Sequence, residues 1–108
     1  MTKEIGALQR VFPCSISRIL DHMIAMKEFD YSISDISKIT EINFKTTLES
    51  VHSLEDQGIL KLTRIIGRAK MYQLDKGSPQ AKHIEGLAFE IAKRSIAIQA
   101  HPQIRQTS

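Results

Sequence analysis

The fold is decided by residues 31–75, which read Tyr31-Ser-Ile-Ser-Asp-Ile-Ser-Lys-Ile-Thr40, Glu41-Ile-Asn-Phe-Lys-Thr-Thr-Leu-Glu-Ser-Val-His-Ser-Leu-Glu-Asp-Gln-Gly58 and Ile59-Leu-Lys-Leu-Thr-Arg-Ile-Ile-Gly-Arg-Ala-Lys-Met-Tyr-Gln-Leu-Asp75. This stretch predicts a short helix, a tight turn, a longer helix and a two-stranded hairpin. Ser34 is a favoured cap for the short helix, whose Ile36 and Ile39 are expected to face inward. Asn43 is a favoured cap for the longer helix, and Gly58 supplies the left-handed position that ends it.

The longer helix, residues 44–57, is amphipathic when its residues are placed at about 100° intervals around the axis. The predicted inner face consists of Phe44, Thr47, Leu48, Val51 and Leu54. The predicted outer face consists of Lys45, Thr46, Glu49, Ser50, Ser53 and Asp56.

The hairpin combines strand-like alternation with a local excess of positive charge. Leu60, Leu62, Tyr72 and Leu74 alternate as half-buried strand residues do, and Gly67-Arg68-Ala69 forms the predicted tip. The alternation fails near Arg64-Ile-Ile66, where a twist or bulge is expected. The basic residues Lys61, Arg64, Arg68 and Lys70 occur here with no acidic residue among them. They fit a phosphate-binding element, although a solvated hairpin whose lysines protect its edges has the same composition.

Length and composition are those of one globular domain. The chain has 108 residues, 42% of them hydrophobic and 25% charged, a size at which an oligomer would help to bury a core. The net charge of +3 is unevenly spread: residues 1–58 hold 6 Lys and Arg against 9 Asp and Glu, whereas residues 59–108 hold 9 against 3. No apolar run predicts a membrane-spanning helix or a signal peptide. The single Cys14 fits a reducing cytoplasm, which is the expected location.

The flanking segments complete the predicted architecture. Residues 1–14 are weakly patterned and are expected to form an arm that packs on a neighbour or a frayed tail. Ser15 is expected to cap an amphipathic helix that runs to about Lys27. A last helix is predicted at 80–99, and residues 100–108 are expected to form a flexible tail.

The last helix has an unusually broad apolar arc, which calls for more than one partner surface. Its main stripe consists of Ile84, Leu87, Ala88, Ile91, Ser95 and Ile98. Packing on the first helix of the same domain covers one side. The apolar side that remains uncovered predicts a homodimer with this stripe at the interface. The alternative is a helix that packs only on the core of its own chain.

Several segments resemble the winged helix-turn-helix transcriptional regulators, in particular small single-domain prokaryotic and archaeal members of the MarR and ArsR type. They are Thr40-Glu-Ile-Asn-Phe-Lys-Thr-Thr-Leu-Glu-Ser-Val-His-Ser-Leu-Glu-Asp-Gln-Gly-Ile-Leu60, its ending Leu54-Glu-Asp-Gln-Gly-Ile-Leu60, and the strand Lys70-Met-Tyr-Gln-Leu74. The resemblance implies a mainly α fold with a small β-hairpin, a winged helix-turn-helix domain at 15–76 and a C-terminal dimerisation helix. It also implies a regulator that binds double-stranded DNA as a homodimer, with no cofactor.

The resemblance assigns roles to residues by their place in the motif. The recognition helix would enter the major groove, and the hairpin, or wing, would contact the backbone or the minor groove. The implied DNA-binding residues are Asn43, Lys45, Thr46, Glu49, Ser50 and Ser53 in the helix and Arg64, Arg68 and Lys70 in the wing.

Two other functions are kept open. The helix at 44–57 holds one lysine against Glu49, Glu55 and Asp56, which favours a protein-interaction module in a transcription or replication assembly. A non-specific architectural DNA binder is the other alternative. The chain is not expected to be an enzyme or to bind a metal, since it lacks a glycine-rich phosphate loop, a nucleophile elbow and zinc-ligand spacing. The sequence does not indicate an effector.

Overall fold

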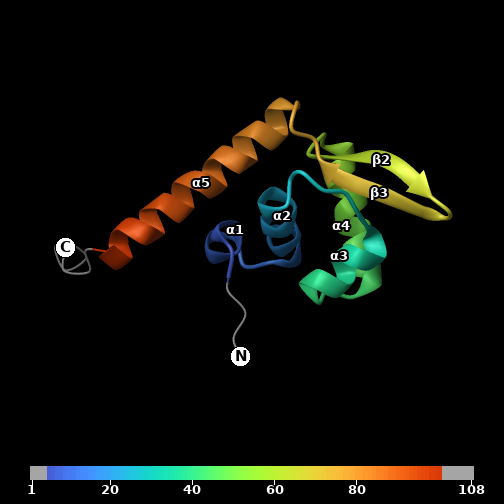
Figure 1. The fold of residues 1–108 in the computed structure, drawn as a ribbon. Coiled ribbons are helices and arrows are strands. Elements are labelled where there is room, and N and C mark those ends of the chain that lie inside the picture. The colour runs from blue at the N-terminus through green and yellow to red at the C-terminus, as the bar shows by residue number, and fades with distance from the viewer. Residues whose placement is uncertain (1–4, 101–108) are drawn as a thin grey trace.

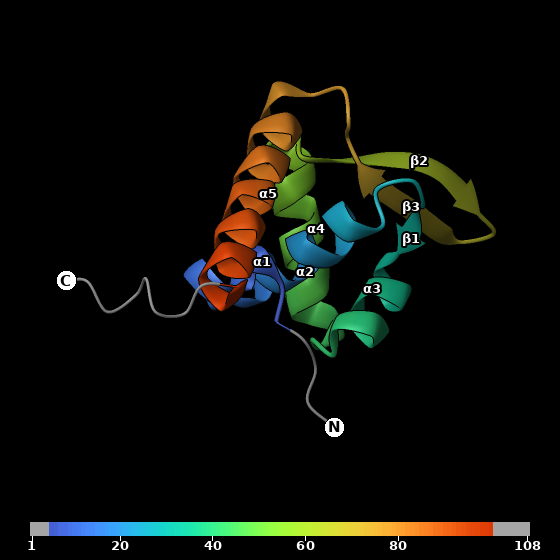
Figure 2. The same ribbon diagram turned by 60° about the vertical axis from the view of Figure 1, so that its left-hand side comes forward.

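The computed structural model describes residues 5–100, with side chains described as far as Ile98. The described elements are α1 (Ala7–Val11), α2 (Ser15–Ala25), β1 (Tyr31–Ser32), α3 (Ile33–Thr40), α4 (Phe44–Asp56), β2 (Leu60–Ile66), β3 (Ala69–Leu74) and α5 (Pro79–Ala100). The predicted mainly α fold with a small hairpin is confirmed. The hairpin projects from one side of the helical body and α5 lies on the other, beside α1 (Figures 1 and 2). The tail expected at 100–108 lies outside the described residues, apart from Ala100 at the end of α5.

Helix α3 begins at Ile33, two residues before the start that a cap at Ser34 predicts. Ser32, not Ser34, is the cap: its hydroxyl accepts from the Asp35 amide at 3.1 Å, and the Asp35 carboxylate accepts from the Ser32 amide at 3.3 Å. This reciprocal arrangement is a capping box, which satisfies amides that the first helical turn leaves open. Ile36 is buried as predicted, but the inward position expected for Ile39 is wrong, because Thr40 occupies it and donates to the Ile36 carbonyl at 2.7 Å.

Helix α4 begins and ends where the sequence predicts. The Asn43 side chain accepts from the Thr46 amide at 2.8 Å, and Gly58 has a φ of 78°, in the left-handed region. The buried face is rotated from the predicted one. Ser50 is only 8% exposed, whereas Phe44 is 53% exposed. Both expectations were therefore wrong, because the contact with the core is centred on Thr47, Val51 and Leu54, and Phe44 lies at its edge.

The sheet has three antiparallel strands in the order β1-β3-β2. The hairpin register contains the irregularity predicted near Arg64, between Leu62 and Arg64. Leu60, Tyr72 and Leu74 are buried, but Leu62 is exposed, because β2 leaves the body after its first residue. The turn at the tip has two residues, Gly67 and Arg68, and Gly67 has a φ of 61°, a conformation that glycine adopts without strain.

The N-terminal segment contains a helix where the sequence predicts an arm. Leu8 of α1 is 1% exposed and belongs to the core. The Asp21 carboxylate of α2 accepts from the amides of Leu8 and Gln9 at 2.9 and 3.0 Å, which satisfies the start of α1. The extended residue before α2 is Cys14, and the predicted cap Ser15 is the first helical residue instead.

Helix α5 packs on the core through part of the stripe that was predicted to form a dimer interface. Ala88 is buried within the chain, and Ile84 and Ile91 pack against the same core. The expected interface role of Ala88 is therefore wrong, because its side chain faces α5's own domain. The large apolar side chains that α5 exposes are Leu87, Phe89 and Ile96. No helix in the described part of the chain is long and apolar enough to cross a membrane.

Candidate nucleic-acid interface

The outer face of α4 is polar and mostly exposed. Lys45, Glu49 and Ser53 lie on it and are exposed, whereas Thr46 is half-buried at its margin. Ser50 is buried and does not reach this face. The Asn43 side-chain oxygen is already used by the Thr46 amide. The face can therefore offer an ammonium, a carboxylate and a hydroxyl to a base edge or a phosphate.

Two exposed residues of α4 were missed as candidates from the sequence. His52 lies seven residues after Lys45, or about two helical turns, and is therefore on the same face. Phe44, the first helical residue, adds an exposed aromatic ring. The spacing of seven residues from Lys45 could have indicated that His52 lies on the outer face. The exposure of Phe44 depends on where the core ends, and no nearby sequence feature indicates it.

The wing lies next to this face of α4. A shallow hollow of about 300 Å³ is lined by Phe44, Leu48 and His52 on α4 and by Arg68, Lys70 and Tyr72 on the hairpin side. Arg68 and Lys70 are exposed, and neither forms an ion pair with another described residue. Two basic side chains therefore stand beside the helix face that carries Lys45, and the two elements form one continuous surface.

Arg64 differs from the other basic residues of the wing because it is paired within the chain. Its Nε and Nη2 donate to the two carboxylate oxygens of Asp30 at 2.9 and 3.2 Å, and the Thr63 hydroxyl donates to Asp30 at 2.6 Å. The Arg64 guanidinium, followed by the Thr63 hydroxyl, lowers the pKa of Asp30. Asp30 therefore stays ionised and offsets the positive charge of Arg64, which was predicted to contact DNA.

The loop before β1 fixes the wing to the helices. Lys27 pairs with Glu85 of α5, and the Lys27 carbonyl accepts from Gln73 of β3 at 2.8 Å. Glu28 pairs with Lys76, just after β3, at 2.8 Å. Together with Asp30, these contacts join one short loop to β2, β3 and α5, and they set the direction in which the hairpin projects.

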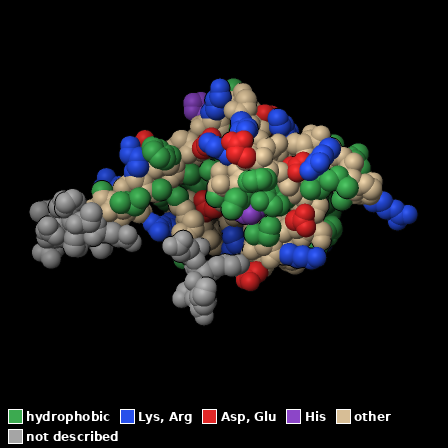
Figure 3. All heavy atoms as spheres, in the orientation of Figure 1, with side chains coloured by type: hydrophobic (Ala, Val, Ile, Leu, Met, Phe, Trp, Pro, Cys, Tyr) green, Lys and Arg blue, Asp and Glu red, His purple; other side chains and the backbone are tan. Residues whose placement is uncertain are grey.

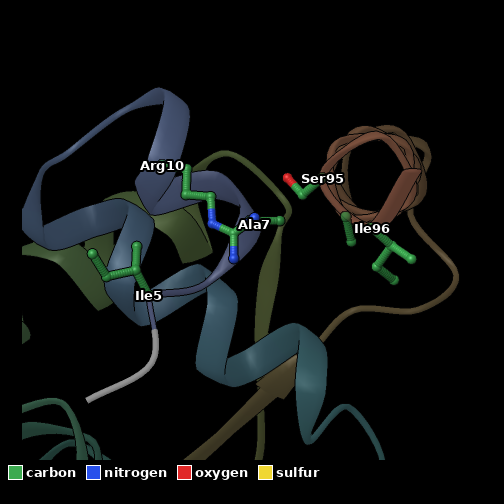
Figure 4. A pocket seen from close by; sticks show the side chains of 6 residues that line it. Ile5, Ala7, Arg10, Ser95 and Ile96 are labelled. Carbon is green, nitrogen blue, oxygen red and sulfur yellow. The ribbon is translucent and has the colours of Figure 1, made fainter. Parts of the chain in front are cut away.

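A second surface lies between α1 and α5. A hollow of about 250 Å³ is lined by Ile5, Ala7 and Arg10 on one side and by Ala92, Ser95 and Ile96 on the other. Figure 4 shows Ala7 and Arg10 facing Ser95 and Ile96 across it. Exposed isoleucines at both ends make this surface suitable for covering by another polypeptide. No group of three His, Cys, Asp or Glu within the described ranges is arranged to hold a metal ion.

A helix-turn-helix formed by α3 and α4, followed by the β2–β3 hairpin, defines the winged helix-turn-helix class, and solved structures of that class have the same fold. MepR, a transcription regulator of the Staphylococcus aureus multidrug efflux pump MepA, matches with a TM-score of 0.66 at 16% identity, over 93% of this chain and 78% of MepR. The homodimeric winged helix-turn-helix DNA-binding domain of Mb0332 from Mycobacterium bovis, a possible ArsR-family transcriptional regulator, matches with a TM-score of 0.56 at 14% identity, over 86% of this chain and 91% of that one. The adhesin competence repressor AdcR from Streptococcus pyogenes matches with a TM-score of 0.57 at 15% identity, over 94% of this chain and 73% of AdcR. No protein-family model and no curated protein sequence matches the chain.

Proposed function

We propose that this protein is a transcriptional regulator that binds duplex DNA as a homodimer. The outer face of α4 enters the major groove, and the wing contacts the flanking backbone or the minor groove. The observation that supports this most is the hollow shared by Phe44 and His52 with Arg68 and Lys70. This surface therefore offers the outer face of a helix together with two cations that form no ion pair with another described residue. MepR and Mb0332, which share the fold, are described as a transcription regulator and a DNA-binding domain.

The roles within this surface follow from the position of each residue. Lys45 lies in the first turn of α4, where the positive end of the helix dipole adds to its attraction for a phosphate. Ser53 and His52 can contact base edges or phosphates, and Glu49 can accept from a cytosine amino group. Arg68 and Lys70 neutralise phosphates and contribute the salt-dependent part of the affinity.

The dimer would form through the exposed side of α5 and the adjoining surface of α1. Leu87, Phe89 and Ile96 are exposed on α5, and Val11 and Phe12 are exposed at the end of α1. Ser95 and Ile98, which are half-buried, lie along the same helix. Burying these apolar groups favours association. A dimer also doubles the number of phosphate contacts, which offsets the single lysine of each α4.

Fluorescence anisotropy of a labelled random duplex, titrated with protein at several salt concentrations, tests DNA binding. We expect binding at low salt that weakens steeply as salt increases. Lys45→Ala combined with Arg68→Ala should weaken it much more than Lys82→Ala combined with Arg94→Ala, which removes two exposed cations from α5. Equal losses from the two pairs would contradict the assigned surface, and equal affinity for every duplex would identify a non-specific architectural binder.

The acidic residues of α4 favour a second candidate, a protein-interaction module. Glu49 and Asp56 are exposed on the same face as Lys45, so a basic partner would find complementary charge there. A protein that binds no duplex at low salt, but keeps its fold by circular dichroism, would support this function and contradict the regulator.

A further inference from the structure

The tip of the wing carries two large apolar side chains that the core does not use. Ile65 is 59% exposed and Ile66 is 51% exposed, and both come directly before the turn at Gly67 and Arg68. In Figure 3, hydrophobic and basic side chains gather at the hairpin end of the molecule. More than half of each isoleucine is left uncovered by the chain, so two neighbouring isoleucines at a projecting tip are suited to an apolar environment supplied by a partner.

The strand register puts one isoleucine on each face of the tip. Ile65 is opposite Lys70, and Ile66 is opposite Ala69. Directly paired residues share a face and successive residues alternate, so Ile65 and Ile66 point to opposite faces. Ala69 is too small to cover Ile66. Each face of the tip therefore presents an uncovered isoleucine.

The charges around the isoleucines indicate what kind of partner fits. Arg68 and Lys70 flank them, and residues 57–74 contain no acidic side chain. A positively charged rim around an apolar tip is complementary to a duplex groove, where phosphates line the edges and a separated base step exposes apolar base faces. A protein partner would need a hydrophobic patch surrounded by acids, whereas every DNA duplex provides the phosphates.

We propose that Ile65 and Ile66 form an apolar wedge that the wing inserts into the minor groove. Arg68 and Lys70 hold the phosphates on either side, and an isoleucine partly unstacks one base step, which kinks the duplex. The proposal rests on the DNA binding proposed above. It adds a source of specificity at the flanks, because pyrimidine–purine steps unstack more easily than others.

Bending is measured by resonance energy transfer between dyes at the two ends of a duplex of about 30 base pairs, selected from a random pool by the wild-type protein. Each protein is added until anisotropy of the same duplex shows saturation. The wild type should kink the duplex by roughly 20–90°, seen as increased transfer. Ile65→Ala combined with Ile66→Ala should bind without most of this increase. Met26→Ala is the control, because Met26 is a large apolar side chain that is 43% exposed at the end of α2, outside both the wing and the proposed dimer surface.

The outcomes separate the wedge from DNA binding itself. Wild-type protein that binds the duplex and leaves it straight would overturn the wedge while the proposed function stands. A duplex bent as strongly by the double variant as by the wild type would also overturn it. No binding at low salt by the wild type would overturn both. The single variants Ile65→Ala and Ile66→Ala should show which face of the tip inserts, and unchanged bending in both would count against the proposal.

A fluorescent adenine analogue placed at a TA step reports unstacking directly. Its emission should increase when the wild type binds and should increase much less with the double variant. The same increase with both proteins would contradict an isoleucine between the bases.

Discussion

Asp30 holds Arg64 through a two-pronged ion pair, with Nε and Nη2 of the guanidinium 2.9 and 3.2 Å from the two carboxylate oxygens. The pair ties β2 to the loop before β1, 34 residues earlier in the chain. It removes one of the four basic residues of the wing from easy contact with DNA. The positive charge that the wing can offer to DNA therefore depends on Asp30, which no local sequence motif connects to the wing.

Replacing Asp30 with Asn should release this charge. Arg64 then becomes available to a phosphate, so Asp30→Asn should strengthen DNA binding and steepen its salt dependence by about 0.9 in log–log slope for each protomer bound. Anisotropy titrations at several salt concentrations measure both. Glu28→Gln is the control, because Glu28 lies in the same loop and pairs with Lys76 rather than with the wing strand β2. Equal effects of the two substitutions would mean that only net charge matters.

Replacing Arg68 with Ala should weaken binding to all duplexes. Arg68 is in the turn at the hairpin tip and forms no ion pair with another described residue, so its loss should remove a phosphate contact without breaking an ion pair of the fold. We expect the log–log salt slope to decrease by about 0.9 for each protomer bound, with little change in sequence preference. Unchanged affinity and slope would exclude the wing from the interface.

Replacing Leu8 with Ala tests whether α1 belongs to the folded domain. Leu8 is almost completely buried in the core, so its truncation should lower the free energy of unfolding by about 2–5 kcal/mol. Gln9→Ala, at a half-buried polar position of the same helix, should change it by no more than about 0.5 kcal/mol. Urea denaturation measures both. A loss for Leu8→Ala as small as that for Gln9→Ala would mean that the segment is a detached arm.

His22 should make stability depend on pH. Its Nε2 is buried and has no hydrogen-bond partner among the described residues. The centroid of its ring lies 4.8 Å from the centroid of the Tyr31 ring. Burial lowers the pKa of His22 below its ordinary value of 6.5, so the folded chain favours the neutral ring. The folded state has its full stability with respect to His22 above pH 6.5, where the ring is neutral in both the folded and the unfolded chain. As pH falls from 6.5 toward the lower pKa of the folded state, the unfolded chain takes up a proton first, and the free energy of unfolding decreases.

A neutral substitute for His22 provides the comparison. The free energy of unfolding of the wild type should decrease more between pH 7.5 and pH 5 than that of His22→Gln. Urea denaturation at a series of pH values within this range measures the difference. Parallel pH profiles for the two proteins would show that His22 carries no such linkage.

The parts of the fold that follow from local chemistry were predicted from the sequence. Asn43 caps α4 because its side chain reaches an amide three residues later, and Gly58 ends that helix because it adopts positive φ without strain. The irregularity at Arg64 was also predicted, because a break in alternation is visible along one strand. Each of these features depends on residues that are close together in the sequence.

The features that depend on distant residues were not predicted. Helix α1 depends on an acceptor, Asp21, that belongs to α2, and the cap of α3 is Ser32 because β1 pairs with β3 up to that residue. The burial of Ser50 follows from how α4 is rotated against the core. Among the candidate site residues, Arg64 has its partner Asp30 across a tertiary contact that no sequence pattern marks.

DNA recognition by a homodimer is tested best by a hydroxyl-radical footprint on the duplex selected from a random pool by the wild-type protein. Two α4 helices in successive major grooves should protect two regions about 10 base pairs apart on one face of the duplex. Both protections should weaken together in the variant that combines Lys45→Ala with Arg68→Ala. A single protected region, or uniform protection along the duplex, would contradict a homodimer that reads DNA through two copies of α4.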